Sequence, residues 1–327
     1  MNRSSVGMVT PVLNGARWLD GMLASVRAQT YARWQLLVVD DGSTDDTVEI
    51  ATAHAAADER IRVVAGTGVR RGAPKVRAHG RGLLPTDCAY LYFPDADDEL
   101  EPELLDRLVS RLSGRPDAVA AFCRYRRIDE AGRPLAEEPP PRIVMTDRWS
   151  RALRDDESET PFESIYGWAA PAMEPVTMFR AEAYDHSGGW GAWPTQGGES
   201  VDLLCRMLRD GPVLFEPSPL YRYRKHSGQH SRDQERLAAA ARGLRERWRE
   251  RAISDRGLSV LVGRAEFFVD HRLEPRWGVS GAMRRARRGD LWGASRFLLG
   301  ALRRYRWRAP VTPAVSPANS TRAGGGA

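Results

Sequence analysis

Short apolar segments alternate with helix-like segments along the first third of the chain, and this alternation constrains the fold more than any other feature. The apolar runs at 6–10, 35–39, 61–64 and 89–93 have the length and composition of buried strands. Between the first two runs, apolar residues follow helical spacing at Trp18, Leu19, Met22, Leu23 and Val26. Strands that alternate with helices are typical of a parallel sheet. We therefore predict an α/β fold with a mostly parallel sheet flanked by helices.

Polar or acidic residues stand where three of these strands end. Thr10 and Pro11 end the first strand, Asp40 and Asp41 end the second, and the acidic run 95–99 (Asp-Ala-Asp-Asp-Glu) follows the fourth. Ligands of an open parallel sheet bind beyond the carboxyl ends of its strands. Two carboxylates separated by one residue can hold a hard divalent cation that bridges a diphosphate. We therefore predict a ligand site at this edge, centred on the acidic run.

Two common phosphate-binding loops are missing from the sequence. No G-x-G-x-x-G pattern follows the first strand, and the chain has no Walker A loop. Phosphate charge would then have to be neutralised in another way, which favours a metal ion at the acidic run. A metal-dependent nucleotidyltransferase is an alternative, because it also binds a metal ion through acidic residues at strand ends. Such enzymes usually carry a glycine-rich, lysine-containing loop after the first strand, whereas residues 14–17 read Asn-Gly-Ala-Arg.

The charge of the chain is unevenly distributed. The net charge is +6 over 327 residues, but residues 232–327 contain 21 arginines and 9 acidic residues, a net +12, so residues 1–231 carry −6. The high pI therefore does not indicate a nucleic-acid partner.

The three cysteines have no metal-site spacing and are odd in number, which fits a reducing cytoplasm. We expect a cytoplasmic protein, because the sequence shows neither a signal peptide nor a membrane-spanning segment.

The sequence predicts three regions. Residues 1–231 form the α/β domain, residues 232–308 a basic helical extension, and residues 309–327 a disordered tail rich in Pro, Ser and Gly. Segment 270–308 combines apolar and basic residues in a way that can place helices on an anionic membrane surface. Peripheral contact with the inner face of the membrane is therefore one hypothesis. The alternative is a helix pair packed on the α/β domain with an arginine-rich exposed face.

Three segments of this chain resemble a known family. They are Val-Thr-Pro-Val-Leu-Asn-Gly at 9–15, Leu-Val-Val-Asp-Asp-Gly-Ser-Thr-Asp at 37–45 and Tyr-Phe-Pro-Asp-Ala-Asp-Asp at 92–98. Together they resemble the family 2 glycosyltransferases, which have the Rossmann-like GT-A fold and a D-x-D motif. The resemblance covers residues 6–231 and is strongest over the first hundred. It implies a transferase that moves a sugar from a nucleoside diphosphate donor to a hydroxyl acceptor by a single displacement with inversion.

The resemblance also implies roles for individual residues. The donor would be bound by two groups of residues. The base and ribose would contact Thr10, Pro11, Asp40 and Asp41. The D-x-D residues Asp95, Ala96 and Asp97 would also contact the donor, with Asp95 and Asp97 at its ribose, and Arg77 would be a further donor-binding residue. A Mg2+ or Mn2+ ion on Asp97 would bind the diphosphate, and uridine is the base that the family favours. The acceptor would be a glycan, a lipid-linked sugar, a natural product or a peptide.

The catalytic base is where this sequence departs from the family. Inverting members have an acidic pair at the start of a late helix, and here the segment reads Gly-Glu-Ser-Val-Asp at 198–202. Ser200 stands where the family usually has an aspartate, so Glu199 is the first candidate for the base and Asp202 the second. This departure keeps a non-catalytic nucleotide-sugar-binding relative as another alternative.

Several further residues receive predicted roles. His226 lies in a segment that resembles the late histidine loop of the family, and it would complete the metal or diphosphate site, with His230 as a second choice. Asp98 and Glu101 fit a capping box for the helix that follows. Three tryptophans can form either a sugar-stacking wall or part of the core: Trp168, Trp190 and Trp193.

Overall fold

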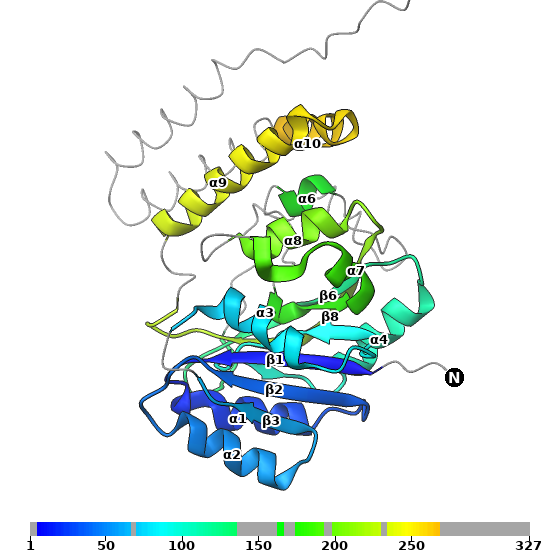
Figure 1. Ribbon diagram of the computed structural model, residues 1–327. Helices are drawn as coiled ribbons and strands as arrows, with labels where there is room; N and C mark the ends of the chain where they lie inside the picture. Colours follow the sequence, from blue (N-terminus) through cyan, green and yellow to red (C-terminus); the bar gives the residue numbers. More distant parts are fainter. Residues whose placement is uncertain are drawn as a thin grey trace, which may run out of the picture. The chain divides into compact units, whose positions relative to one another are not determined.

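The structure is a computed structural model that describes residues 5–66, 70–135, 162–166, 174–192, 198–229 and 234–268 (Figure 1). The chain divides into two compact units, Met1–Phe268 and Val269–Ala327. The predicted membrane segment 270–308 and the predicted tail 309–327 lie outside the described residues, as do His230, Trp168 and Trp193. The first unit includes two helices beyond residue 231, where the sequence analysis placed a domain boundary.

A mixed sheet forms the centre of the first unit. Its order is β3-β2-β1-β4-β7-β6-β8-β5 in the described residues. The strands are β1 (Val6–Val12), β2 (Trp34–Asp40), β3 (Ile61–Val64), β4 (Tyr90–Tyr92), β5 (Glu99–Leu100), β6 (Ala120–Ile128), β7 (Thr177–Arg180) and β8 (Val213–Arg224). Strands β1 to β4 are parallel, and β7 runs antiparallel between β4 and β6. The predicted α/β fold with a mostly parallel sheet is confirmed.

The helices follow the apolar spacing of the sequence. They are α1 (Ala16–Arg27), α2 (Thr47–Ala57), α3 (Ala73–Leu83), α4 (Leu104–Gly114), α6 (Phe162–Tyr166), α7 (Ala181–His186), α8 (Glu199–Met207), α9 (Gln234–Ile253) and α10 (Arg256–Phe268), with short 3-10 helices η1 (Glu174–Val176) and η2 (Gly189–Ala192). In α1, Leu19, Met22, Leu23 and Val26 are buried because they share one face of the helix. No helix in the described part of the chain is long and apolar enough to cross a membrane.

Helix α3 approaches the sheet closely enough to position a site residue. A Cβ atom added to Gly80 would lie 2.4 Å from Cγ1 of Val9, so only glycine allows α3 to pack at this distance from β1. Arg77 lies one turn earlier on α3 and is buried. The close packing therefore holds the Arg77 side chain at the edge of the sheet where β1 and β4 end.

Helices α9 and α10 lie beside α6 and α8, on the side of the molecule away from α1 and α2 (Figure 1). One carboxylate holds α6, α9 and α10 together, because Glu266 accepts hydrogen bonds from Arg245, Arg249 and the hydroxyl of Tyr166. Burial raises the pKa of Glu266, but the hydrogen bonds from Arg245, Tyr166 and Arg249 outweigh it and lower the pKa to about 2. This carboxylate is therefore charged at neutral pH and stabilises the helix cluster.

Candidate functional site

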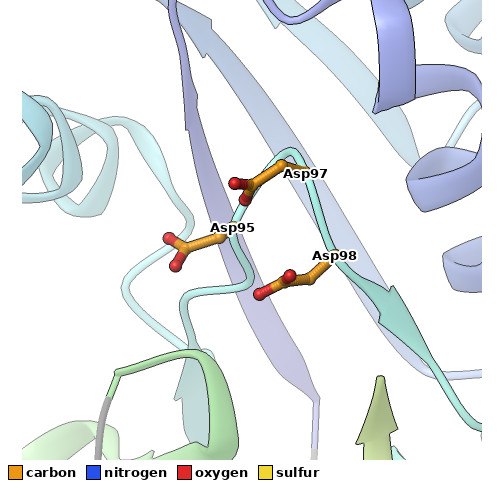
Figure 2. Close-up of side chains that lie close together, drawn as sticks. All are labelled: Asp95, Asp97 and Asp98. Atoms are coloured by element: carbon orange, nitrogen blue, oxygen red, sulfur yellow. The ribbon is translucent and has the colours of Figure 1, made fainter. Parts of the chain in front are cut away.

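Three aspartates gather in the loop between β4 and β5. One carboxylate oxygen from each of Asp95, Asp97 and Asp98 lies within 4.8 Å of the other two, and Figure 2 shows the three side chains close together on this loop. Asp95 and Asp97 are partly exposed, each with 31% of its side chain accessible, whereas Asp98 is fully buried. We call these three residues the acid cluster. It lies at the edge of the sheet that the sequence predicted.

Asp98 joins the acid cluster to β8 and does not cap a helix. Its Oδ2 accepts a hydrogen bond from the hydroxyl of Tyr221 at 2.8 Å, and its Oδ1 accepts one from the backbone N–H of Arg224 at 2.7 Å. Helix α4 begins after Glu103 and has no side-chain cap, so the predicted capping role of Asp98 is wrong. Burial, followed by the charges of Asp97 and Asp95, raises the pKa of Asp98 well above its ordinary value, although the two hydrogen bonds oppose the shift.

Arg77 contacts the acid cluster from α3. Its Nη2 lies 2.6 Å from Oδ1 of Asp95, in an ion pair whose arginine side chain is buried. The centre of the guanidinium group also lies 5.6 Å from the ring of Trp190. Trp190 is itself buried against Phe93, Phe179 and Tyr184, so it belongs to the core and not to a sugar-stacking wall. This packing fixes the position of a positive charge beside the acid cluster.

His226 contacts the acid cluster from the loop after β8. Its Nε2 lies 2.8 Å from Oδ2 of Asp97, although the two residues are 129 positions apart in the sequence. The imidazole packs on the ring of Trp18, with 4.3 Å between the ring centroids. The indole N–H of Trp18 donates to the carbonyl oxygen of Glu130 at 3.2 Å, which holds the ring in place. Trp18 was not predicted as a site residue, because its spacing shows only that it lies on an amphipathic helix.

The chemistry of these side chains fits a hard divalent cation. Mg2+ prefers oxygen ligands, which carboxylates supply. The 2.8 Å between Asp97 Oδ2 and His226 Nε2 is a hydrogen-bond distance, and it places the imidazole beside the carboxylates. The second partly exposed carboxylate, that of Asp95, lies beside Asp97. The acid cluster therefore fits a Mg2+ or Mn2+ ion, and His226 lies next to it, whereas Ala96 offers only backbone groups.

Asp40 and Asp41 line a small cavity at the end of β2. The carboxylate of Asp40 accepts backbone hydrogen bonds from Gly42 and Ser43 at 3.1 Å, and that of Asp41 accepts them from Arg71 at 2.8 Å and Gly72 at 2.9 Å. The cavity has a volume of about 20 Å³, and its wall includes both aspartates, Arg71 and His79.

Thr10 and Pro11 differ in what they can contact. Thr10 is fully buried in β1, and its hydroxyl has no partner among the described residues. This burial argues against the predicted contact between Thr10 and a donor base. Pro11 is only half-buried at the end of β1, so it can still border a ligand.

The two candidates for the catalytic base lie on α8 in different surroundings. Glu199 begins the helix directly after Gly198, whose φ angle of 88° turns the chain into the helix. Asp202 has no exposed surface, and its oxygens accept hydrogen bonds from Arg206, Trp248 and Arg251. A carboxylate in these contacts cannot reach an acceptor hydroxyl, so the structure does not support Asp202 as the base.

Comparison with known proteins gives a consistent family. The sequence model described as Glycosyl transferase family 2 matches residues 8–170. TuaG of Bacillus subtilis, provisionally named a teichuronic acid biosynthesis glycosyltransferase, is 31% identical over 135 residues, which are 40% of this chain and 50% of TuaG. Glycosyltransferase GlyG of Streptococcus pneumoniae serotype 4 is 28% identical over 126 residues, or 38% of this chain and 40% of GlyG. The chain thus spans half or less of the length of these curated relatives.

Solved structures share the fold. Residues 1–349 of S. aureus TarS in complex with UDP-GlcNAc superpose with a TM-score of 0.62 and 14% identity, covering 93% of each chain. The mannosyltransferase PcManGT of Pyrobaculum calidifontis, in complex with GDP-Man and Mn2+, has a TM-score of 0.60 and 17% identity over 94% of this chain and 88% of its own. At these identities the likeness shows a common fold, which confirms the GT-A-like architecture.

Proposed function

The chain belongs to the family 2 glycosyltransferases, and from this premise we propose that it transfers a sugar from a nucleoside diphosphate donor to a hydroxyl group, assisted by a metal ion at the acid cluster. The observation that carries the proposal is the acid cluster itself. Two partly exposed carboxylates stand between a buried arginine at 2.6 Å and a histidine at 2.8 Å. A site with these charges can attract both a cation and the diphosphate that the cation neutralises.

Asp95, Asp97 and His226 would hold the ion. When bound, a Mg2+ or Mn2+ ion supplies positive charge to the diphosphate as the bond to the sugar breaks. Arg77 orients Asp95, because its guanidinium group is buried and forms an ion pair with that carboxylate. The ligand arrangement supports the role that the family resemblance gives to Asp97.

Glu199 would be the base of a single displacement. The acceptor oxygen attacks the anomeric carbon, the bond from that carbon to the diphosphate oxygen breaks, and its electron pair leaves with the nucleoside diphosphate. The acceptor proton passes to a carboxylate oxygen of Glu199, and the configuration of the anomeric carbon is inverted. The position of Glu199 in the first turn of α8 supports this role, since Ser200 has no basic group and Asp202 is bonded to other side chains.

The nucleoside would bind at the end of β2, in contact with Asp40 and Asp41. Uridine is the proposed base, on the strength of the family resemblance. The similar solved structures hold a uridine donor in one case and a guanosine donor in the other, so both belong in any test. The acceptor would be a glycan, a lipid-linked sugar, a natural product or a peptide.

Release of nucleoside diphosphate from a panel of UDP- and GDP-sugars tests the function, with water or an added sugar as the acceptor. We expect release in Mn2+ and none after chelation. Glu199→Gln should lower the rate about 100-fold or more and leave donor binding intact, because only proton transfer is lost. Arg209→Gln, at an exposed ion pair with Asp255, is the matched control and should keep the wild-type rate.

Two outcomes would replace the proposal by its alternatives. Donor binding without release, unaffected by Glu199→Gln, would indicate a non-catalytic nucleotide-sugar-binding relative. Release of pyrophosphate from a nucleoside triphosphate and a sugar phosphate would indicate a nucleotidyltransferase.

The same proposal places the protein in the cytoplasm, with segment 270–308 in peripheral contact with the inner face of the membrane. Flotation with anionic liposomes tests the contact. The chain with this segment should float and a chain ending at residue 268 should not, whereas both would stay in the soluble fraction if the segment does not bind lipid.

A further inference from the structure

One buried carboxylate connects the helix that carries Glu199 to the C-terminal helices. Asp202 has no exposed surface, and its Oδ1 accepts hydrogen bonds from the indole N–H of Trp248 at 3.1 Å and from Nη1 of Arg251 at 3.0 Å. Both donors lie on α9. The Oδ2 atom accepts from Nε of Arg206 at 2.9 Å, on α8 itself. Asp202 thus holds α8 and α9 together through two donors on α9, and a third donor on α8 completes its contacts.

The same residue closes the first turn of α8. The backbone N–H of Asp202 donates to the carbonyl oxygen of Gly198 at 2.9 Å. Glu199 lies inside this turn, three residues before Asp202. Because the side chain of Asp202 is fixed by α9 and its backbone closes the turn, a shift of α9 would move Glu199.

Arg206 extends the connection toward the acid cluster. Its Nη2 donates to the carbonyl oxygen of Gly189 at 2.8 Å, and its Nη1 donates to that of Ser187. These carbonyls flank the start of η2, which carries Trp190. The ring of Trp190 lies 5.6 Å from the guanidinium group of Arg77, the partner of Asp95. A continuous series of contacts therefore runs from α9 to the acid cluster.

The ring of Trp248 also packs against other side chains. Trp248 is buried, its ring lies edge-on to Phe162 of α6 at a centroid distance of 5.7 Å, and the guanidinium group of Arg251 lies 5.2 Å from it. Trp248→Phe would keep an aromatic ring beside Phe162 and remove the hydrogen bond to Asp202, although the ring is smaller. The variant therefore removes the hydrogen bond while most of the core packing is kept.

We infer that Asp202 is a positioning residue that sets Glu199 through its contacts with Trp248 and Arg251, so that residues 234–268 form part of the active-site scaffold. The inference rests on the proposed function for the role of Glu199. Through these contacts, α9 would help to position Glu199 for the transfer reaction.

The test compares the double variant Trp248→Phe/Arg251→Gln with the control Arg209→Gln, which breaks an exposed ion pair between the end of α8 and the α9–α10 turn. The rate of donor hydrolysis is divided by the number of donor-binding chains, measured by calorimetry, so that unfolded protein does not count. We expect the normalised kcat to fall about 10-fold or more with KM for the donor within about 2-fold, because small displacements of a catalytic group cost rate and not donor binding. The control should change neither value.

Hydrogen exchange supplies a readout that needs no activity. The amide of Asp202, which closes the first turn of α8, should exchange about 10-fold faster in the double variant than in the wild type or the control, because that turn loses its external support. Wild-type exchange in this turn, together with an unchanged normalised kcat, would overturn the inference. If the wild type hydrolyses no donor, the proposed function fails and the exchange comparison alone decides. If the double variant does not fold, Trp248→Phe alone should show a smaller shift in the same direction, and its absence would overturn the inference.

Discussion

Replacing Asp97 by asparagine should make the metal-free protein more stable and the Mn2+-saturated protein less stable than the wild type. The variant removes one negative charge and changes no shape. In the structure the carboxylate oxygens of Asp95 and Asp97 lie within 4.8 Å of each other. Two unit charges at that distance repel by about 3.5 kcal/mol at an effective dielectric constant of 20.

The net effect is smaller than this repulsion. Each side chain is 31% exposed, Arg77 lies 2.6 Å from Asp95, and His226 lies 2.8 Å from Asp97. Solvent and these partners reduce the relief to about 1 kcal/mol, or roughly 2 °C in Tm for a domain of this size. Mn2+ at 100 times its dissociation constant would stabilise the wild type by about 2.7 kcal/mol and the variant by far less, so the order reverses.

Thermal unfolding in chelator and in Mn2+ with a nucleoside diphosphate measures both effects. Asp117→Asn is the control, because Asp117 forms an exposed ion pair with Arg115 and lies outside the acid cluster. It should unfold at nearly the same temperature as the wild type in both conditions. A less stable Asp97→Asn variant in chelator would show that Asp97 supports the fold through His226. An equal Mn2+ effect on variant and wild type would refute the assignment of Asp97 to the metal.

Three further predictions concern the surroundings of the site. Trp18→Ala should lower Mn2+ affinity about 10-fold, and Trp18→Phe should keep most of it, because the ring at position 18 packs on His226, which contacts the acid cluster. Electron paramagnetic resonance measures both affinities, and equal values would contradict this. Gly80→Ala should destabilise the protein by about 1–3 kcal/mol in urea unfolding, since its Cβ would lie 2.4 Å from Val9. Gly82→Ala should be neutral or stabilising, because its Cβ would meet no atom within 4 Å. Similar losses of stability for both variants would refute the packing argument. The pKa of Glu266 is lowered to about 2 from 4.5, so its stabilisation is present above pH 4.5 and is lost as the pH falls toward 2. Acid unfolding of Glu266→Gln should therefore depend less on pH in that range, and an unchanged dependence would show that other groups dominate.

Most of the fold could be predicted because short apolar runs and helical spacing identify its strands and helices. Apolar runs identified β1 to β4, and their carboxyl ends identified the edge at which the acid cluster lies. The antiparallel strand β7 was not predicted. It pairs with Tyr90–Tyr92, nearly ninety residues earlier, and a short strand carries no local sign of its partner.

The site was harder to predict because its contacts join distant parts of the chain. The resemblance selected His226, but only the structure brings it within 2.8 Å of Asp97. Asp202 has the helical spacing expected of a second catalytic acid, and its partner Trp248 lies 46 residues later. Spacing along one helix shows which residues share a face, but it does not show what packs against that face.

The configuration of the released sugar tests the central claim most directly. The wild type would be incubated with an α-linked nucleotide sugar, and the anomer formed first would be followed by proton NMR in Mn2+ and in chelator. A single displacement at the acid cluster predicts that the β anomer appears first and only when Mn2+ is present. Initial release of the α anomer, or release at the same rate in chelator, would contradict metal-assisted transfer with inversion.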